Sequence, residues 1–324
     1  MLIYMTRFIV QPMLAMLFAT LSLDGGAQNY PNKPMRVVAA ETGGSSDFTA
    51  RLMAFGLTNA LGQQVVVDNR GGHGIIPGEI VSRAAPDGYT LLIYTGNLWI
   101  SPMLSGRNSY DPVRDFVPIT LASRAPNVLV VSPTSTANTV KDLIEMAKAR
   151  PGQINYATGS FGSASHLSGT LFKSMARLDI VHVPYKGSAP ALIDLMANRV
   201  QLMFPSAASV TPQVKAGKLK ALAVTSATPS SLSPGLPTVA AAGLPGFEIV
   251  AIFGIWAPAG TSDAIVRRIH RESARYLSMP DTREKFFNGG VEVIASTPEQ
   301  LAAAMKSEMA RLSRMIKETG LREQ

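Results

Sequence analysis

Short β-rich runs alternate with helix-like runs in the first third of the chain. Between about Asp47 and Leu61, the apolar residues Phe48, Leu52 and Phe55 recur at helical spacing. This alternation predicts parallel strands joined by crossover helices, the start of a doubly wound α/β lobe. The elements are strands at 35–39, 64–67 and 90–94, and helices at 47–61 and 76–84.

A second series of the same kind follows a polar, proline-bearing stretch at 101–118. Two short apolar runs, 117–121 and 127–131, lead out of the first series. The first helix of the new series is expected to be capped by Asn138 or Thr139. The series comprises helices at 140–149, 163–177, 189–197 and 210–216, and strands at 154–156, 180–183, 201–204 and 219–224. It predicts a second doubly wound lobe.

The last part of the chain is expected to return to the first lobe. The stretch 229–245 is rich in Ser, Pro and Gly and predicts a connector, and the apolar run 247–257 predicts a return crossing. A mainly helical tail follows, and it should pack on the first lobe, which otherwise has only three strands. Its elements are helices at 263–277, 281–288 and 298–319 and a strand at 291–294. Two crossings between lobes predict a hinge.

The N-terminal stretch is typical of a secretory signal. Arg7 precedes an apolar segment at 8–23, and small residues up to Ala27 suit cleavage there. A membrane anchor is the alternative, but the apolar segment is short and contains Gln11 and Pro12. We therefore predict a periplasmic protein divided into a signal peptide (1–27), lobe one (28–127 plus 250–324) and lobe two (128–249).

The composition argues against metal and cofactor chemistry. The chain has no cysteine, which excludes thiolate metal sites and cysteine nucleophiles. Its four histidines, His73, His166, His182 and His270, show no close pairing, and neither an HExxH motif nor an EF-hand loop occurs. We expect neither a metal nor a cofactor.

Catalysis and nucleic-acid binding are also not expected. A serine esterase needs a G-x-S-x-G elbow, which is absent, and adjacent Ser165 and His166 cannot face each other as a dyad. A serine hydrolase therefore stays a minor alternative, with no catalytic residue assigned. The net charge of +8 suits an acidic partner, but the Lys and Arg residues are scattered, which indicates a solvated surface.

Each predicted lobe contains a loop of small residues immediately before a helix. One is Gly43-Gly44-Ser45-Ser46, and the other is Gly159-Ser160-Phe161-Gly162-Ser163. Helix N-termini carry unpaired N–H groups and a partial positive charge, so they hold carboxylates without Arg or Lys. Such loops lie at the carboxyl ends of strands, where open α/β sheets bind ligands. Ordinary turns and N-caps are the alternative, but two loops on separate lobes favour a ligand clamp.

Several segments, in this order and spacing, resemble the periplasmic receptors of tripartite tricarboxylate transporters, often called Bug receptors. The segments are Gly43-Gly44 with Asp47, Asp68-Asn69-Arg70, Ala85 to Leu91, Tyr110-Asp111-Pro112 with Asp115-Phe116, Asn155-Tyr156, Ser165-His166-Leu167, Val183 to Gly187, Ala216 to Leu219, and Ala257 to Thr261. The resemblance implies a type II periplasmic-binding (Venus flytrap) fold. It also implies a monomer that binds a small organic acid and delivers it to the membrane subunits of a transporter. A receptor that serves a signalling partner is the alternative.

By position, the resemblance implies a pocket that holds a carboxylate through backbone amides, short polar side chains and water. Its residues would be Glu41, Thr42, Gly43, Gly44, Ser45, Ser46, Asp47, Thr95, Asn97, Ser160, Gly162, Ser163, Ser165, Pro205 and Ser206.

Two positions depart from the family pattern. Pro205 stands where many members have an aspartate, which makes an α-amino acid ligand less expected. Ala40-Glu41-Thr42 stands where an aromatic residue and prolines are common, and Glu41 could face either the cleft or solvent. Glu41 and the lack of a nearby Arg favour a monocarboxylate or an aromatic acid.

Overall fold

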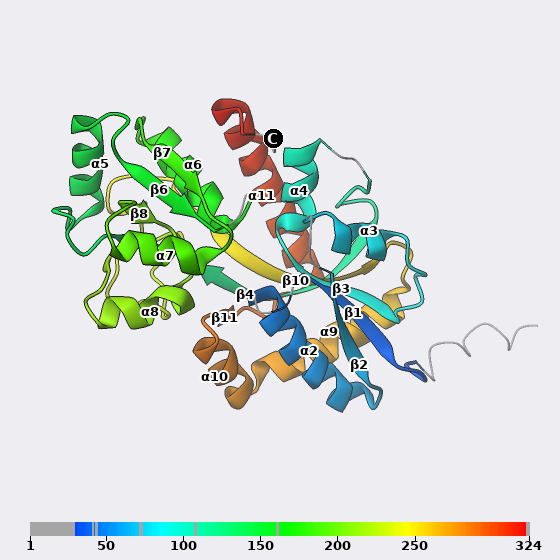
Figure 1. The fold of residues 1–324 in the computed structure, drawn as a ribbon. Coiled ribbons are helices and arrows are strands. Elements are labelled where there is room, and N and C mark those ends of the chain that lie inside the picture. The colour runs from blue at the N-terminus through cyan, green and yellow to red at the C-terminus, as the bar shows by residue number, and fades with distance from the viewer. Residues whose placement is uncertain are drawn as a thin grey trace, which may run out of the picture.

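Two β-sheets form the centre of the structure, one in each lobe (Figure 1). The computed structural model describes residues 30–40, 42, 45–70, 74–106, 109–159 and 162–321. The expected signal peptide, 1–27, lies outside the described residues. Each sheet has two buried apolar clusters, which helices cover. The predicted α/β architecture with two lobes is confirmed.

The first lobe contains a six-stranded sheet in the order β11-β4-β10-β3-β1-β2. β1 pairs in parallel with β2 on one side and β3 on the other, so the carboxyl ends of these three strands share one edge. The strands are β1 (Met35–Ala39), β2 (Val65–Asn69), β3 (Thr90–Thr95), β4 (Phe116–Pro126), β10 (Val250–Pro258) and β11 (Glu292–Val293). The helices are α2 (Ser45–Leu61), α3 (Ile76–Ser82), α4 (Asn97–Ser105), α9 (Asp263–Ser278), α10 (Pro280–Asn288) and α11 (Pro298–Thr319).

The second lobe contains a five-stranded sheet in the order β7-β6-β8-β5-β9. β6 runs parallel to both β7 and β8, and α6 joins β6 to β7. The strands are β5 (Val128–Val131), β6 (Asn155–Thr158), β7 (Val181–Pro184), β8 (Leu202–Met203) and β9 (Lys220–Val224). The helices are α5 (Val140–Ala149), α6 (Ala164–Met175), α7 (Ser188–Met196) and α8 (Ala207–Lys215). Within the described residues, no helix combines the length and apolar character that a membrane span needs.

Two long strands connect the lobes and run antiparallel to each other. β4 leaves lobe one and β10 returns to it, and the pair extends from Phe116 opposite Pro258 to Pro126 opposite Val250. β5 likewise runs antiparallel to β8 and β9, and the sequence analysis had assigned no direction to β4, β5 or β10. Asn127 separates β4 from β5, so the chain changes sheet at that residue.

Helix α4 lies where the sequence analysis expected a polar, irregular stretch. Its interior contains Pro102, which has no N–H to donate to the carbonyl of Leu98. The hydroxyl of Tyr110 donates to that carbonyl instead, at 2.9 Å. Gly106, in the left-handed conformation, then caps the C-terminus of the helix. The expectation is wrong over 101–105 because the replacement donor lies outside the helix.

The C-terminal tail packs on the first lobe, as predicted. β11 pairs with β4, and α9 lies against α2. Gly56 of α2 permits this close approach, because a Cβ at that position would lie 2.3 Å from Cδ1 of Tyr276. α11 contacts both α4 and α6, so it reaches the second lobe.

We predict that Tyr110→Phe destabilises the protein by about 1 kcal/mol, because the buried carbonyl of Leu98 loses its donor. Urea unfolding would measure the change. Tyr89→Phe is the matched control, since the hydroxyl of Tyr89 bonds Asn32 at the exposed surface. Equal losses in both variants would contradict the role assigned to Tyr110.

Candidate functional site

The lobe-one loop, residues 40–44, connects the carboxyl end of β1 to α2. Ser46 and Asp47, in the first turn of α2, are buried, whereas Thr42 is exposed and Ser45 is partly exposed. The predicted residues Glu41, Gly43 and Gly44 lie outside the described residues. The described part of the loop is therefore a strand end leading into a helix N-terminus, as the sequence predicted.

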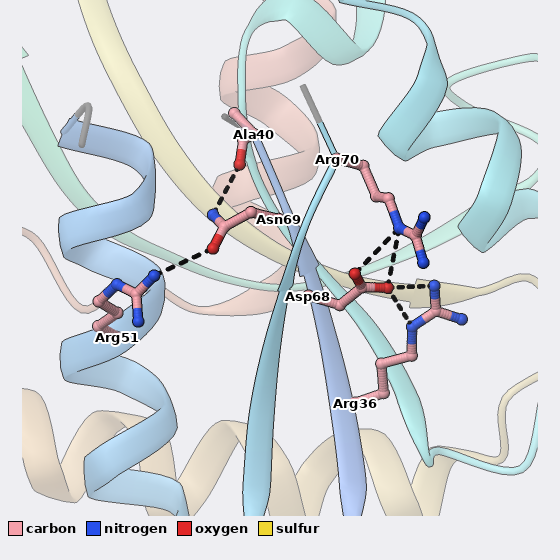
Figure 2. Close-up of polar contacts among 6 residues, drawn as sticks. All are labelled: Arg36, Ala40, Arg51, Asp68, Asn69 and Arg70. Carbon is pink, nitrogen blue, oxygen red and sulfur yellow. Dashed lines mark hydrogen bonds and ion pairs between the residues drawn. The ribbon is translucent and has the colours of Figure 1, made fainter. Parts of the chain in front are cut away.

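Asn69, at the end of β2, bonds both ends of the lobe-one loop. Its Nδ2 donates to the carbonyl of Ala40 at 2.7 Å and to Oδ1 of Asp47 at 2.9 Å. Its Oδ1 accepts from Arg51 of α2, as Figure 2 shows. β1 and β2 are paired with Ala39 opposite Asn69, which brings the amide to the loop. One side chain thus fixes where the loop leaves the sheet and where it enters the helix.

Asp68, next to Asn69, makes a separate ion-pair cluster. Arg36 and Arg70 both donate to its carboxylate (Figure 2). Partial burial raises the pKa of Asp68, but the hydrogen bonds from the two arginines outweigh that effect and hold the pKa below its ordinary value. Because both arginine side chains are 40% exposed or more, this cluster contributes little to stability.

The lobe-two loop, residues 159–163, connects the carboxyl end of β6 to α6. Gly162 adopts a φ of 71°, which favours glycine. Ser163 caps α6, because its hydroxyl accepts from the backbone N–H of His166 at 3.3 Å. Ser165 is buried in the first turn, and the predicted residue Ser160 lies outside the described residues.

Two stacked histidines lie beneath the lobe-two loop. The rings of His166 (α6) and His182 (β7) are 4.7 Å apart, and Tyr156 stacks on His182 at 4.9 Å. Nδ1 of His166 accepts from the N–H of Gly162 at 3.1 Å, and Nε2 of His182 lies 2.7 Å from the hydroxyl of Thr158. Burial, with a contribution from His182, lowers the pKa of His166 to about 4. Burial, and then Lys173, lowers the pKa of His182.

The lobe-two loop lies against α4 of lobe one. A Cβ on Gly162 would lie 3.4 Å from Cδ1 of Leu104 and 3.8 Å from Cγ2 of Ile100. The predicted residues Thr95 and Asn97 flank the start of α4, where the N–H of Asn97 donates to the hydroxyl of Thr95 at 3.1 Å. The lobe-two loop therefore contacts α4, the helix at whose start Thr95 and Asn97 lie.

Helices α2 and α8 approach each other across the Gly289-Gly290 turn. A Cβ on Gly289 would lie 2.2 Å from Phe48 in the first turn of α2. A Cβ on Gly290 would lie 2.2 Å from Cβ of Ala208 in the first turn of α8. The N-terminal turns of α2 and α8 therefore contact the same Gly289-Gly290 turn, while the loop before α6 contacts α4.

The predicted residues Pro205 and Ser206 connect β8 to α8. The carbonyl of Pro205 accepts from the N–H of Val128, and Ser206 forms a β-bridge with the crossing residue Asn127. The hydroxyl of Ser206 lies 2.9 Å from that of Ser209. Both predicted residues therefore lie beside the crossing between the lobes.

Four buried serine hydroxyls have no hydrogen-bond partner within the described part of the chain, and two of them lie next to the predicted loops. These two belong to Ser46 and Ser165, which are 7% and 9% exposed. Each lies in the first turn of a helix that follows one of the two predicted loops. A buried hydroxyl without a partner is unusual, so each is a donor available to a ligand or a water.

Glu308 of α11 lies close to the start of α4. A Cβ on Gly96 would lie 3.5 Å from Oε1 of Glu308. Burial raises the pKa of Glu308 to about 7, while Arg311 opposes the rise and Glu248 adds to it. Arg311 itself pairs with Glu248, just before β10, at 2.8 Å. The sequence analysis gave no role to Glu308, because only the fold brings it to α4.

Two arrangements are relevant among the described residues, a Ser165–His166 dyad and a cluster of metal-ligating side chains. The Nδ1 atom of His166 accepts from Gly162, its ring stacks on His182, and the hydroxyl of Ser165 has no described partner, so no Ser165–His166 dyad exists. Among the described residues, no group of three His, Cys, Asp or Glu side chains is placed to hold a metal ion.

The chain matches one protein family over most of its length. The family model for the tripartite tricarboxylate transporter family receptor (TctC) matches residues 49–321. The UPF0065 protein in the tcbD-tcbE intergenic region of Pseudomonas sp. (strain P51) is 38% identical over 292 residues, covering 89% of this chain and 87% of that protein. Protein BugT of Bordetella pertussis is 33% identical over 320 residues, covering 98% of both chains.

Solved structures agree with these sequence matches. Rpa4515 of R. palustris with adipate gives a TM-score of 0.80 at 35% identity, covering 90% of this chain and 99% of that one. The periplasmic binding protein BugD gives 0.77 at 34% identity, covering 91% and 100%. MatC (Rpa3494) from Rhodopseudomonas palustris with bound malate gives 0.76 at 28% identity, covering 89% and 100%. The predicted two-lobed fold of a periplasmic binding protein is confirmed.

We predict that Asn69→Ala destabilises the protein by about 1–2 kcal/mol, since it removes the hydrogen bonds at both ends of the lobe-one loop. Asp68→Ala is the matched control and should cost less than about 1 kcal/mol, because its partners are exposed. Chemical denaturation of both variants measures the difference. The opposite ranking would show that Asn69 does not hold the loop.

We predict that Glu308→Gln becomes more stable relative to the parent protein as pH rises from about 4.5 to 7. A carboxyl whose pKa is raised by folding stabilises the fold below its unfolded pKa, and that stability is lost as pH rises through about 7. Gln cannot ionise, so the variant should gain about 1–3 kcal/mol over this range. Thermal unfolding at several pH values checks this, and a pH-independent difference would contradict it.

Proposed function

The chain belongs to the tripartite tricarboxylate transporter receptor family, and we propose that it captures a small organic carboxylate between its lobes and delivers it to a membrane transporter. The observation that carries this proposal is that the N-terminal ends of α6 and α8 in lobe two lie against lobe one, and that α2 and α6 each begin with a buried serine hydroxyl that has no described partner. Such N-termini bind anions through backbone N–H groups and the helix dipole. The role is binding, with no catalytic step.

Lobe closure is the proposed mechanism. Only β4 and β10, with the segments that adjoin them, carry the chain between the lobes, so bending there changes the distance between the two loops. A carboxylate that contacts both loops binds the closed form better and shifts the population toward it. The membrane subunits would then recognise the closed surface.

The proposed location is the periplasm, reached through removal of a signal peptide near Ala27, and the proposed state is a monomer. Members of this family are periplasmic receptors, which agrees with that location. The full proposed pocket comprises the predicted residues, including Glu41, Gly43, Gly44 and Ser160, which lie outside the described residues.

The sequence and the solved structures of relatives favour different classes of ligand. Glu41 and Pro205 favour a monocarboxylate or an aromatic acid over an amino acid or a tricarboxylate. The relatives Rpa4515 and MatC have adipate and malate, which are dicarboxylates, in their solved structures. Our proposal remains a monocarboxylate or aromatic acid, and a binding screen that includes both classes decides.

We predict that at least one organic acid raises the melting temperature in a thermal-shift screen of monocarboxylates, aromatic acids, adipate, malate and citrate. At a concentration 100 times Kd, binding stabilises the native state by about 2.7 kcal/mol, a shift of several degrees. The amide of the same acid is the matched control and should give no shift.

Calorimetry on Ser46→Ala and Ser165→Ala then locates the site, with an expected loss of about fivefold or more in affinity for each. Absence of any carboxylate-dependent shift would refute the proposed function. Citrate binding more tightly than every monocarboxylate would refute the proposed ligand class alone.

A further inference from the structure

The two loops are held in the same way by equivalent strands. In lobe one, β1, α2 and β2 follow each other, and Asn69 at the end of β2 bonds both ends of the intervening loop. In lobe two, β6, α6 and β7 follow in the same order, with β6 and β7 parallel and Tyr156 opposite His182. In lobe two, the strand that corresponds to β2 is β7. Its residue His182 contacts only one end of the lobe-two loop, at Thr158.

The other end of the lobe-two loop is bonded by His166. His182 contacts Thr158, the last residue of β6, and His166 accepts from the N–H of Gly162, immediately before the cap of α6. The stacked rings join these two contacts into one unit. The imidazole pair therefore does in lobe two what the single amide of Asn69 does in lobe one.

We propose that His166 and His182 are a positioning pair that sets the lobe-two loop for carboxylate binding. This inference rests on the proposed function of the cleft. The N–H of Gly162 is used by His166, so it is not a donor for the ligand and instead fixes the orientation of its peptide. The remaining donors of the loop and of the first turn of α6 are then held ready before the ligand arrives, which favours binding.

The arrangement requires a particular tautomer. Nδ1 of His166 must be unprotonated to accept from Gly162, so the proton lies on Nε2. A second proton on Nδ1 would place two donors against each other and release the loop. The low pKa of His166, which burial and His182 cause, keeps the ring neutral near pH 7.

The charged groups around the pair are few. A pocket of about 930 Å³ between lobe two and the end of α11 is lined by both histidines and Tyr156. The charged side chains among its lining residues are Lys173 and Arg177 from α6 and Glu318 from α11. Lys173 opposes protonation of His182, and its Nζ donates to the carbonyl of Ile180. Both rings line this pocket, and His166 is only 2% exposed.

Two substitutions at His166 separate positioning from packing. In His166→Asn, the side-chain oxygen can take the place of Nδ1, whereas His166→Phe keeps the stacked ring and removes the acceptor. We expect Asn to retain affinity within about threefold and Phe to lose about tenfold, the equivalent of one lost hydrogen bond. Calorimetry would use the acid that gives the largest shift in the screen, with adipate as a second probe. His182→Gln and His182→Phe make the same comparison at His182.

A second readout needs no ligand. Long-range ¹H–¹⁵N spectra should show His166 as the Nε2–H tautomer, still neutral at pH 6, and the Gly162 amide should be protected from exchange in the parent and in His166→Asn but not in His166→Phe. Assignment is simple, because the chain has four histidines.

Three results would overturn the inference: the Nδ1–H tautomer, an ordinary pKa near 6.5, or equal affinity in the Asn and Phe variants at His166. If the parent binds no carboxylate, the proposed function fails, and the role in binding fails with it. The spectra and exchange data would then show only whether the pair holds the loop.

Discussion

The antiparallel pairing of β4 with β10 is the contact on which the rest of the structure depends. Its ladder extends from Phe116 to Pro126, and both strands then continue into the second lobe. Backbone hydrogen bonds hold these strands side by side, so the two lobes share one narrow connection rather than two independent linkers. The position of every element around the junction follows from that connection, including α4, α6 and the Gly289-Gly290 turn.

The individual elements of this fold were largely predictable from local pattern. Apolar spacing gave α2, and the capping choice between Asn138 and Thr139 is settled by the side chain of Thr139, which accepts from the N–H of Asp142. α4 could not be predicted in the same way, because the donor that compensates for Pro102 is Tyr110. The direction of the crossing strands β4 and β10 was also not predictable, since they lie outside the alternation of strands and helices that indicates parallel pairing.

The candidate site was likewise predictable only in part. Helix N-termini after small-residue loops can be recognised from composition, and the structure has one in each lobe, with the loop before α6 against α4 and the first turn of α2 against Gly289. The residues that hold these loops were not recognised. Asn69 was noted only as part of a family segment and His182 only as an isolated histidine, because their roles depend on the β1–β2 and β6–β7 registers. Supporting side chains from neighbouring strands require register, which a single sequence does not contain.

The contact between Gly290 and Ala208 has a mechanical consequence for the whole receptor. Without a side chain at 290, the backbone of lobe one comes to rest directly on the first turn of α8, and a single added carbon would lie 2.2 Å from Cβ of Ala208. This turn therefore leaves no room for a side chain between lobe one and the first turn of α8. The absence of a side chain at residue 290, far from the small-residue loops in sequence, thus allows the two lobes to lie this close together at α8.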